Sequence, residues 1–142
     1  MEEKEPSVDG PALRKFANPN YQPLCDSLKE IRQGIDRLDE QIVALLAKRA
    51  MFVKDAARFK ANSFQVAAPA RQAQVFAKAR VLATNQNLGF TGFEDVIEAT
   101  YRTMVAEFIA AEQRYFQTEL VAVAPIGSDN LSIHQFPKKH NV

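Results

Sequence analysis

Arg49, Lys60 and Arg71 are the residues whose types and spacing in this sequence could do chemistry. Lys60 and Arg71 stand eleven residues apart in "KANSFQVAAPAR", on either side of an expected break between two helices. The two charges could be solvated ends of helices, or they could close together over a small acidic molecule. Eleven helical residues at about 100° each would return Lys60 almost to the helix face of Arg49.

Arg49 interrupts an apolar stripe. Apolar residues recur in steps of three and four at Leu28, Ile31, Ile35, Leu38, Ile42, Leu45, Phe52, Ala56 and Phe59. The one missing step in this series is occupied by Arg49. A buried guanidinium without a partner is strongly destabilising, so a partner is expected. That partner could be a protein carboxylate or a bound anion, unless the side chain reaches out to water at the edge of the stripe.

The spacing of Arg49 and Lys60 suits a small dicarboxylate. Their backbones would stand about 16 Å apart along a regular helix, and side chains that reach roughly 6 Å would leave a gap of that size. Arg32 lies about 80 to 100° around the helix from both. It is therefore either a solvated helix charge or, in an intertwined dimer, a residue that reaches the site of the other chain.

Gln113, and the lack of residues with metal-ligand spacing, limit the reactions that the chain could catalyse. Gln113 lies at the rim of an apolar helix face, where it is either an exposed residue or a donor to an ether or hydroxyl oxygen. His134 and His140 are both close to the C-terminus, and no cluster has metal-ligand spacing. We therefore expect no metal, cofactor or nucleophile. A pericyclic rearrangement fits, because it needs a held conformation and charge stabilisation.

Three helices must position these residues. The first begins at a cap formed by Asp26 or Ser27, with Glu30 at capping-box spacing, and runs for about 33 residues or roughly 50 Å. So long an apolar stripe favours a second copy as its cover, and hence a dimer. The second helix is expected to begin near Pro69 and to end before "NLGFTG".

The third helix is predicted over residues 93–120. Its expected buried face consists of Ile97, Tyr101, Met104, Val105, Phe108, Ile109 and Phe116. The predicted fold is all-α, a three-helix protomer with one long first helix. Residues 27–120 would form the helical domain, between flexible tails at residues 1–26 and 121–142.

Composition excludes several partners. The 142 residues carry a net charge of +1, so no basic field points to nucleic acid. No apolar run approaches the roughly 18 to 20 residues that span a membrane. The segment "MEEKEPSVDG" lacks the features of a secretory signal, and Cys25 is the single cysteine. We therefore expect a cytoplasmic protein.

The sequence "LKEIRQGIDRLDEQIVALLAKRAMFVKDAARFKA" resembles the first helix of AroQ-class chorismate mutases. The resemblance extends over residues 28–117. Within that family, "AARFKA" followed by "APAR", and "AEQRYF" at residues 111–116, resemble the isochorismate pyruvate-lyase branch, whose enzymes form salicylate. The resemblance implies the type II fold, a three-helix protomer in an intertwined homodimer with two active sites.

The resemblance also implies roles for five residues. Arg32 of the partner chain and Arg49 would clamp substrate carboxylates. Lys60 would stabilise negative charge on the breaking ether oxygen, and Gln113 would help to position that oxygen. Arg71 would help to close the site. The catalytic residues would thus be Lys60, Arg49 and Gln113, within a binding site that all five share.

The resemblance also bears on the segment between the first two helices and on Gln72. Residues 61–69 would form a mobile lid over the substrate. Gln72 follows Arg71 where many dedicated mutases carry a glutamate that holds the ring hydroxyl. The interval from Arg71 to Gln113 is also longer than in the lyase branch, with the extra residues expected around "NQNLGFTGF".

Three functions follow from these observations. The leading hypothesis is an isochorismate pyruvate-lyase that gives salicylate and pyruvate, with chorismate mutase activity, chorismate to prephenate, in the same site. The first alternative is a dedicated chorismate mutase of phenylalanine and tyrosine biosynthesis. The second alternative is a non-catalytic helical dimer that binds a partner or ligand.

Overall fold

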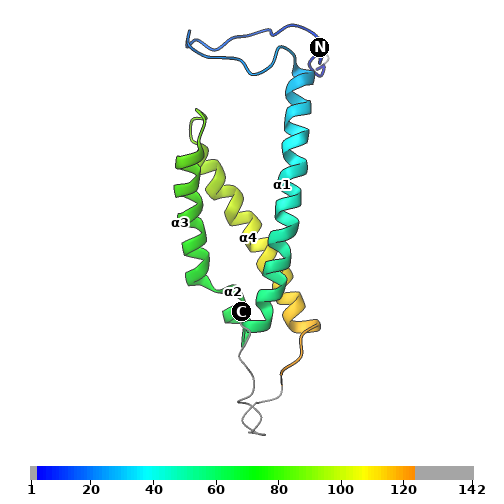
Figure 1. Cartoon of the computed structure of the whole chain (residues 1–142), viewed down its shortest axis with the longest axis vertical. Helices are drawn as coiled ribbons and strands as arrows, with labels where there is room; N and C mark the ends of the chain where they lie inside the picture. Colours follow the sequence, from blue (N-terminus) through cyan, green and yellow to red (C-terminus); the bar gives the residue numbers. More distant parts are fainter. Residues whose placement is uncertain (1–2, 124–142) are drawn as a thin grey trace, which may run out of the picture. The chain divides into compact units, whose positions relative to one another are not determined.

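The computed structural model describes residues 3–123, and these residues contain helices and no strand (Figure 1). In chain order the elements are α1 (Leu28–Ala56), the 3-10 turn η1 (Ala57–Phe59), α2 (Ser63–Ala67), α3 (Pro69–Gln86) and α4 (Phe93–Thr118). The all-α prediction, with one long first helix and two shorter ones, is confirmed, and the structure adds the short helix α2. The chain divides between Phe52 and Val53 into two compact units, which are described separately.

The first unit contains an irregular N-terminal segment and most of α1. The predicted capping box at the start of α1 is present. The hydroxyl of Ser27 accepts a hydrogen bond from the backbone N–H of Glu30 at 3.2 Å, and the carboxylate of Glu30 accepts one from the N–H of Asp26 at 3.0 Å. The N–H of Lys29 donates to the carbonyl oxygen of Val8 at 3.0 Å, which ties the N-terminal segment to the helix start.

The apolar stripe of α1 is exposed to solvent in the protomer. No residue of α1 is buried. The exposed fractions run from 41% to 79% for Ile31, Ile35, Leu38, Ile42, Leu45 and Phe52. Isolated exposed apolar residues are ordinary, but a continuous stripe of them at helical spacing marks an interaction surface.

The α-helical part of α1 ends at Ala56, three residues before the end of the predicted stripe. Residues 57–59 form a 3-10 turn, and Lys60 adopts an extended conformation with φ −104° and ψ 138°. Ala57 is buried, with 1% of its surface exposed, whereas Phe59 is 77% exposed. The predicted regular α-helix therefore stops short of Lys60, and that part of the prediction is wrong.

In the second unit, a short helix, α2, lies in the segment that the sequence predicted as a lid. Asn62 caps α2 by accepting a hydrogen bond from the N–H of Gln65 at 3.0 Å. Gln65 in turn accepts one from the N–H of Ala61 at 2.7 Å. Val66 is 1% exposed, and Ala68 ends the helix with a left-handed backbone, φ 45° and ψ 63°. This segment is ordered by its own caps and by one buried side chain.

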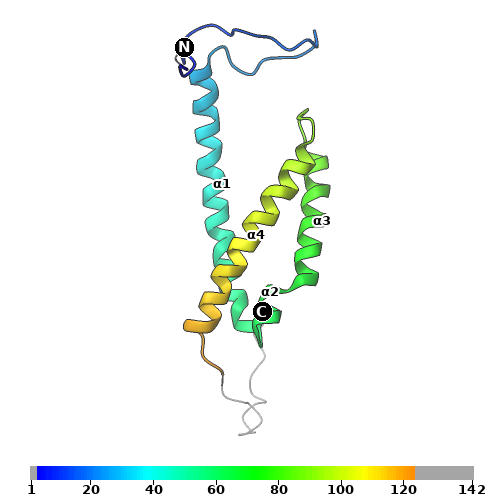
Figure 2. The same ribbon diagram turned by 180° about the vertical axis from the view of Figure 1, so that it is seen from behind.

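Helices α3 and α4 form a hairpin, and α4 also contacts α2 and η1 (Figure 2). The predicted start of α3 at Pro69 and its end before Asn87 are confirmed. The small side chains of Ala79 and Ala83 are buried on α3, as is Val105 on α4. No residue of the predicted buried face of α4 is exposed. Helix α4 is therefore the element against which the rest of the second unit is organised.

Candidate functional site

Lys60 is held by an ion pair with α4. Its Nζ lies 2.9 Å from Oε2 of Glu112. The Lys60 side chain is half-buried, with 21% of its surface exposed, and that of Glu112 is 6% exposed. The extended backbone at Lys60 turns the chain out of the helix that precedes it. A cation with partial access to solvent is thus fixed against a buried carboxylate.

Gln113, the next residue of α4, holds the segment that follows Lys60. Its Nε2 donates a hydrogen bond to the carbonyl oxygen of Ser63 at 2.9 Å, across 50 positions of sequence. Its Oε1 is buried and has no hydrogen-bond partner among residues 3–123. An amide nitrogen carries two N–H donors, so one donor remains after the bond to Ser63. Gln113 therefore offers both a donor and a buried acceptor.

Gln72, on α3, contacts the end of α2 across Ala68, the residue with left-handed backbone that separates the two helices. Its Nε2 donates to the carbonyl oxygen of Ala67, the last residue of α2, at 2.7 Å. The bond spans Ala68, so the side chain of Gln72 fixes the angle at which α3 leaves α2. From the sequence, this position was notable only because it carries an amide where many dedicated mutases carry a glutamate. The structure shows in addition that the Gln72 side chain donates a hydrogen bond to the backbone of Ala67.

The five predicted site residues are divided between the two units. Lys60, Arg71 and Gln113 belong to the second unit, whereas Arg32 and Arg49 belong to the first. Lys60 and Gln113 come together, because successive residues of α4 contact Lys60 and Ser63. Arg71 is exposed in the first turn of α3, and Arg32 is exposed on α1. Arg49 is half-buried on α1.

Glu112 is the residue that sequence reasoning missed. It follows Val105 by seven positions, and the two are the buried residues of α4. Like Arg49 on the first helix, Glu112 is a charged residue at a position of the helix where an apolar residue is expected. The signal was present in "AEQRYF", but the partner cation could be identified only once η1 had turned Lys60 toward α4.

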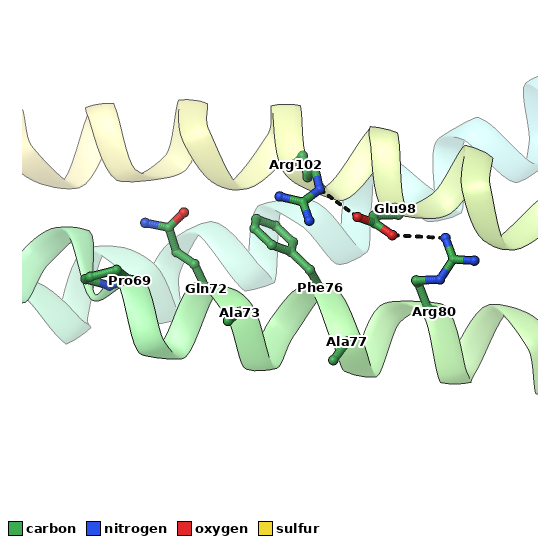
Figure 3. A pocket seen from close by; sticks show the side chains of 8 residues that line it. All are labelled: Pro69, Gln72, Ala73, Phe76, Ala77, Arg80, Glu98 and Arg102. Carbon is green, nitrogen blue, oxygen red and sulfur yellow. Dashed lines mark hydrogen bonds and ion pairs between the residues drawn. The ribbon is translucent and has the colours of Figure 1, made fainter.

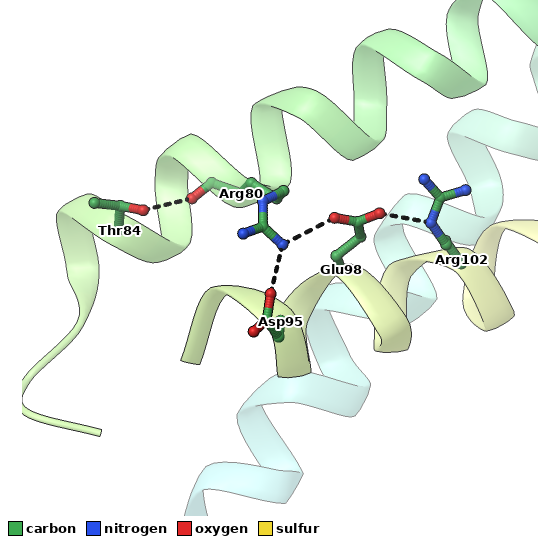
Figure 4. A network of polar contacts seen from close by, with 5 residues as sticks. All are labelled: Arg80, Thr84, Asp95, Glu98 and Arg102. Carbon is green, nitrogen blue, oxygen red and sulfur yellow. Dashed lines mark hydrogen bonds and ion pairs between the residues drawn. The ribbon is translucent and has the colours of Figure 1, made fainter. Parts of the chain in front are cut away.

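A second polar cluster lies between α3 and α4. Arg80 pairs with Asp95 and with Glu98, each at 2.9 Å, and Arg102 pairs with Glu98 at 2.7 Å (Figure 4). The hydrogen bonds from Arg102 and then from Arg80 lower the pKa of Glu98. The bonds to Asp95 and then to Glu98 raise the pKa of Arg80. Two carboxylates thus neutralise two guanidinium groups.

This cluster borders a cavity of about 440 Å³ (Figure 3). The guanidinium of Arg102 also lies over the ring of Phe76, 4.5 Å from its centroid. The lining residues are Pro69, Gln72, Ala73, Phe76, Ala77, Arg80, Glu98 and Arg102. Because the arginines are already paired with carboxylates, the cluster acts as a clamp between α3 and α4 rather than as a receptor for an anion.

No group of three or more histidine, cysteine, aspartate or glutamate residues within residues 3–123 could hold a metal ion. His134 and His140 lie outside the described residues. None of the described helices has the length and apolar character needed to cross a membrane.

Comparison with known proteins gives a consistent result. Residues 31–113 match the sequence model of the family described as chorismate mutase type II. An isochorismate pyruvate lyase from Pseudomonas aeruginosa is 31% identical over 93 residues, which cover 66% of this chain and 88% of that protein. A bifunctional chorismate mutase/prephenate dehydratase from Aquifex aeolicus is 28% identical over 112 residues, which cover 78% of this chain and 29% of that longer protein.

Proposed function

Because the chain belongs to the chorismate mutase type II family, we propose that it is an enzyme that acts on chorismate-type substrates. Its main reaction in this proposal is the elimination of pyruvate from isochorismate to give salicylate, with conversion of chorismate to prephenate in the same site. The similarity to a lyase over 88% of that protein's length supports the first reaction. No cofactor is required.

The pairing of Lys60 with Glu112 beside Gln113 is the observation that carries this proposal. In the elimination, the ether C–O bond breaks while a ring hydrogen moves to the methylene carbon of the enolpyruvyl group, so the protein need not accept a proton. Negative charge accumulates on the ether oxygen. A fixed ammonium and an amide N–H are the groups that stabilise such charge. Lys60 has ammonium donors beyond the one that Glu112 accepts, and Gln113 retains one N–H.

The two carboxylates of the substrate require further cations. In the proposal Arg49 binds one carboxylate and Arg32 of a second copy binds the other, in the bidentate geometry that guanidinium groups favour. Arg71 is exposed at the start of α3, immediately after the short helix α2. This position suits a residue that closes over the substrate together with residues 61–69.

A second copy of the chain is part of this proposal. The exposed apolar stripe of α1, described above, would be covered by the same stripe of a partner in an intertwined homodimer. Burial of such side chains contributes about 25 cal/mol for each square ångström removed from water. The dimer would also bring Arg32 to the partner's site. Residues 27–120 would then be the catalytic domain of a cytoplasmic enzyme.

A dedicated chorismate mutase is the second candidate. The similarity to the bifunctional chorismate mutase/prephenate dehydratase favours it. The two candidates share the same cationic site and differ in the reaction that a bound conformation promotes. The cationic residues therefore do not separate the two candidates, and their products do.

A two-substrate assay tests the proposal. Purified full-length protein is given isochorismate or chorismate, and salicylate, pyruvate and prephenate are quantified. We expect salicylate and pyruvate in equal amounts from isochorismate, and prephenate from chorismate. Prephenate alone would favour the dedicated mutase. If neither substrate is converted, the proposal is wrong and the non-catalytic alternative gains support.

A further inference from the structure

We infer that Glu112 is a positioning residue that fixes the ammonium of Lys60 where the reaction needs positive charge. The inference rests on the proposed function, because it assumes that Lys60 acts on a bound substrate. It adds a residue to the site that was not among the predicted binding or catalytic residues. Glu112 would act through Lys60 and would not touch the substrate.

The two residues differ greatly in freedom of movement. Lys60 follows η1 in an extended conformation, at the start of a connecting segment, and a lysine side chain has four rotatable bonds. Glu112 lies within α4, which contacts η1, α2 and α3, and 5% of its surface is exposed. The 2.9 Å bond between them therefore anchors a side chain with many rotatable bonds to a packed helix.

The bond leaves Lys60 able to bind something else. An ammonium group has three N–H donors, and Glu112 Oε2 accepts one of them. The Lys60 side chain keeps 21% of its surface exposed. Gln113 holds the backbone at Ser63, three residues after Lys60, so consecutive residues of α4 fix the side chain and the segment that follows it.

The stability of the folded protein does not by itself explain a carboxylate at position 112. Position 112 continues the buried stripe of α4 after Val105, where an apolar side chain would pack without desolvating a charge. Replacing a buried ion pair with apolar residues is often neutral or stabilising in other proteins. A carboxylate here also repels a doubly negative substrate, so its value must lie in placing Lys60 and not in binding strength.

These arguments predict how Glu112→Gln should change the kinetics. The glutamine amide oxygen can still accept a hydrogen bond, but the charge that holds the ammonium is gone. We expect kcat to fall at least about tenfold, since small misplacements of a catalytic group have large effects on rate. KM should stay within about threefold or decrease, because repulsion of the substrate is also removed. The control is Glu107→Gln, which changes an exposed carboxylate on the same helix.

A double-mutant cycle shows whether Glu112 acts through Lys60. In a Lys60→Ala background, Glu112→Gln should change kcat less than about twofold, since no ammonium remains to be positioned. A further large loss in that background, or an unchanged kcat in the single variant, would overturn the inference while leaving the proposed function intact.

Two further outcomes are decisive. If Glu112→Gln does not fold, Glu112→Asp keeps the charge but moves it by one methylene, and it should also lower kcat at a nearly constant KM. Wild-type kcat in that variant would overturn the inference. A wild-type protein that converts neither isochorismate nor chorismate would remove the proposed function, and the inference with it.

Discussion

The amide Nε2 of Gln113 lies 2.9 Å from the carbonyl oxygen of Ser63 and joins α4 to the first residue of α2. The side chain proposed to position the substrate's ether oxygen thus also holds the segment proposed to cover it. Under the proposed function, one amide group would couple substrate binding to the position of this segment.

Replacing Gln113 with leucine should loosen this segment and slow the reaction together. Hydrogen exchange at residues 61–67 should become about fivefold faster, because one tertiary hydrogen bond contributes roughly 1 kcal/mol. Loss of a transition-state donor should lower kcat by about 10². Gln117→Leu, an identical change at an exposed position one turn later, should alter neither. Unchanged exchange in Gln113→Leu would show that the bond does not hold the segment.

Gln72→Glu should shift the balance of products. A carboxylate cannot donate to the carbonyl oxygen of Ala67, so it is free to turn toward a substrate hydroxyl, as the glutamate of many dedicated mutases would. We expect the rate of prephenate formation relative to salicylate formation to rise several-fold. Gln74→Glu adds the same charge at an exposed position of α3 and serves as the control. Equal product ratios in the two variants would refute a role for position 72 in specificity.

Ala68→Gly should stabilise the protein. Ala68 has φ 45°, a left-handed conformation that costs non-glycine residues energy and that glycine adopts freely. The free energy of unfolding should rise by up to about 1 kcal/mol, less than the full strain because glycine also gains freedom in the unfolded chain. Chemical denaturation measures this change.

The matched control for Ala68→Gly is Ala77→Gly. Ala77 is exposed within α3, where glycine should lower the free energy of unfolding by about 1 kcal/mol. Changes of the same sign in the two variants would contradict a strained left-handed residue at position 68.

The helices could be predicted because each has local start and stop signals. Ser27 and Glu30 mark the start of α1, Pro69 that of α3, and the glycines of "NLGFTG" the turn before α4. Gly89 and Gly92 both have positive φ in that turn. Such signals act over a few residues, so they can be read without tertiary context.

The site could be predicted only in part, because its geometry depends on contacts between distant segments. The apolar period extends to Phe59, but the α-helix ends at Ala56 and a 3-10 turn with a buried Ala57 follows. The bond from Lys60 to Glu112 spans 52 positions of sequence. A carboxylate at a core position of α4 is visible in the sequence, but neither its partner cation nor the end of the α-helix at Ala56 has a local pattern there.

The clamp between α3 and α4 should weaken in acid. Hydrogen bonds from Arg102 and Arg80 lower the pKa of Glu98 below its ordinary 4.5 in the folded protein. A lowered pKa in the folded state stabilises the protein above the unfolded-state value, and this contribution is lost as pH falls through the folded-state value. The Tm of wild type should therefore exceed that of Glu98→Gln near neutral pH.

Thermal melts of the two proteins from pH 7 to pH 3 test this expectation. The difference in Tm should stay constant down to about pH 4.5 and then shrink. Glu107→Gln, at an exposed position outside the cluster, should show a small difference throughout. A difference for Glu98→Gln that grows in acid would contradict the assigned direction.

A mixed dimer tests most directly whether two copies share each cationic site. Chains carrying Arg32→Ala or Lys60→Ala are co-expressed with different tags, and the heterodimer is purified and assayed with isochorismate and chorismate. Each variant alone should lose at least about 10² in turnover. The heterodimer should regain about half of the wild-type rate per dimer, since one of its two sites then has both residues intact. A heterodimer no more active than its parents, or a wild-type chain that stays monomeric, would contradict the account.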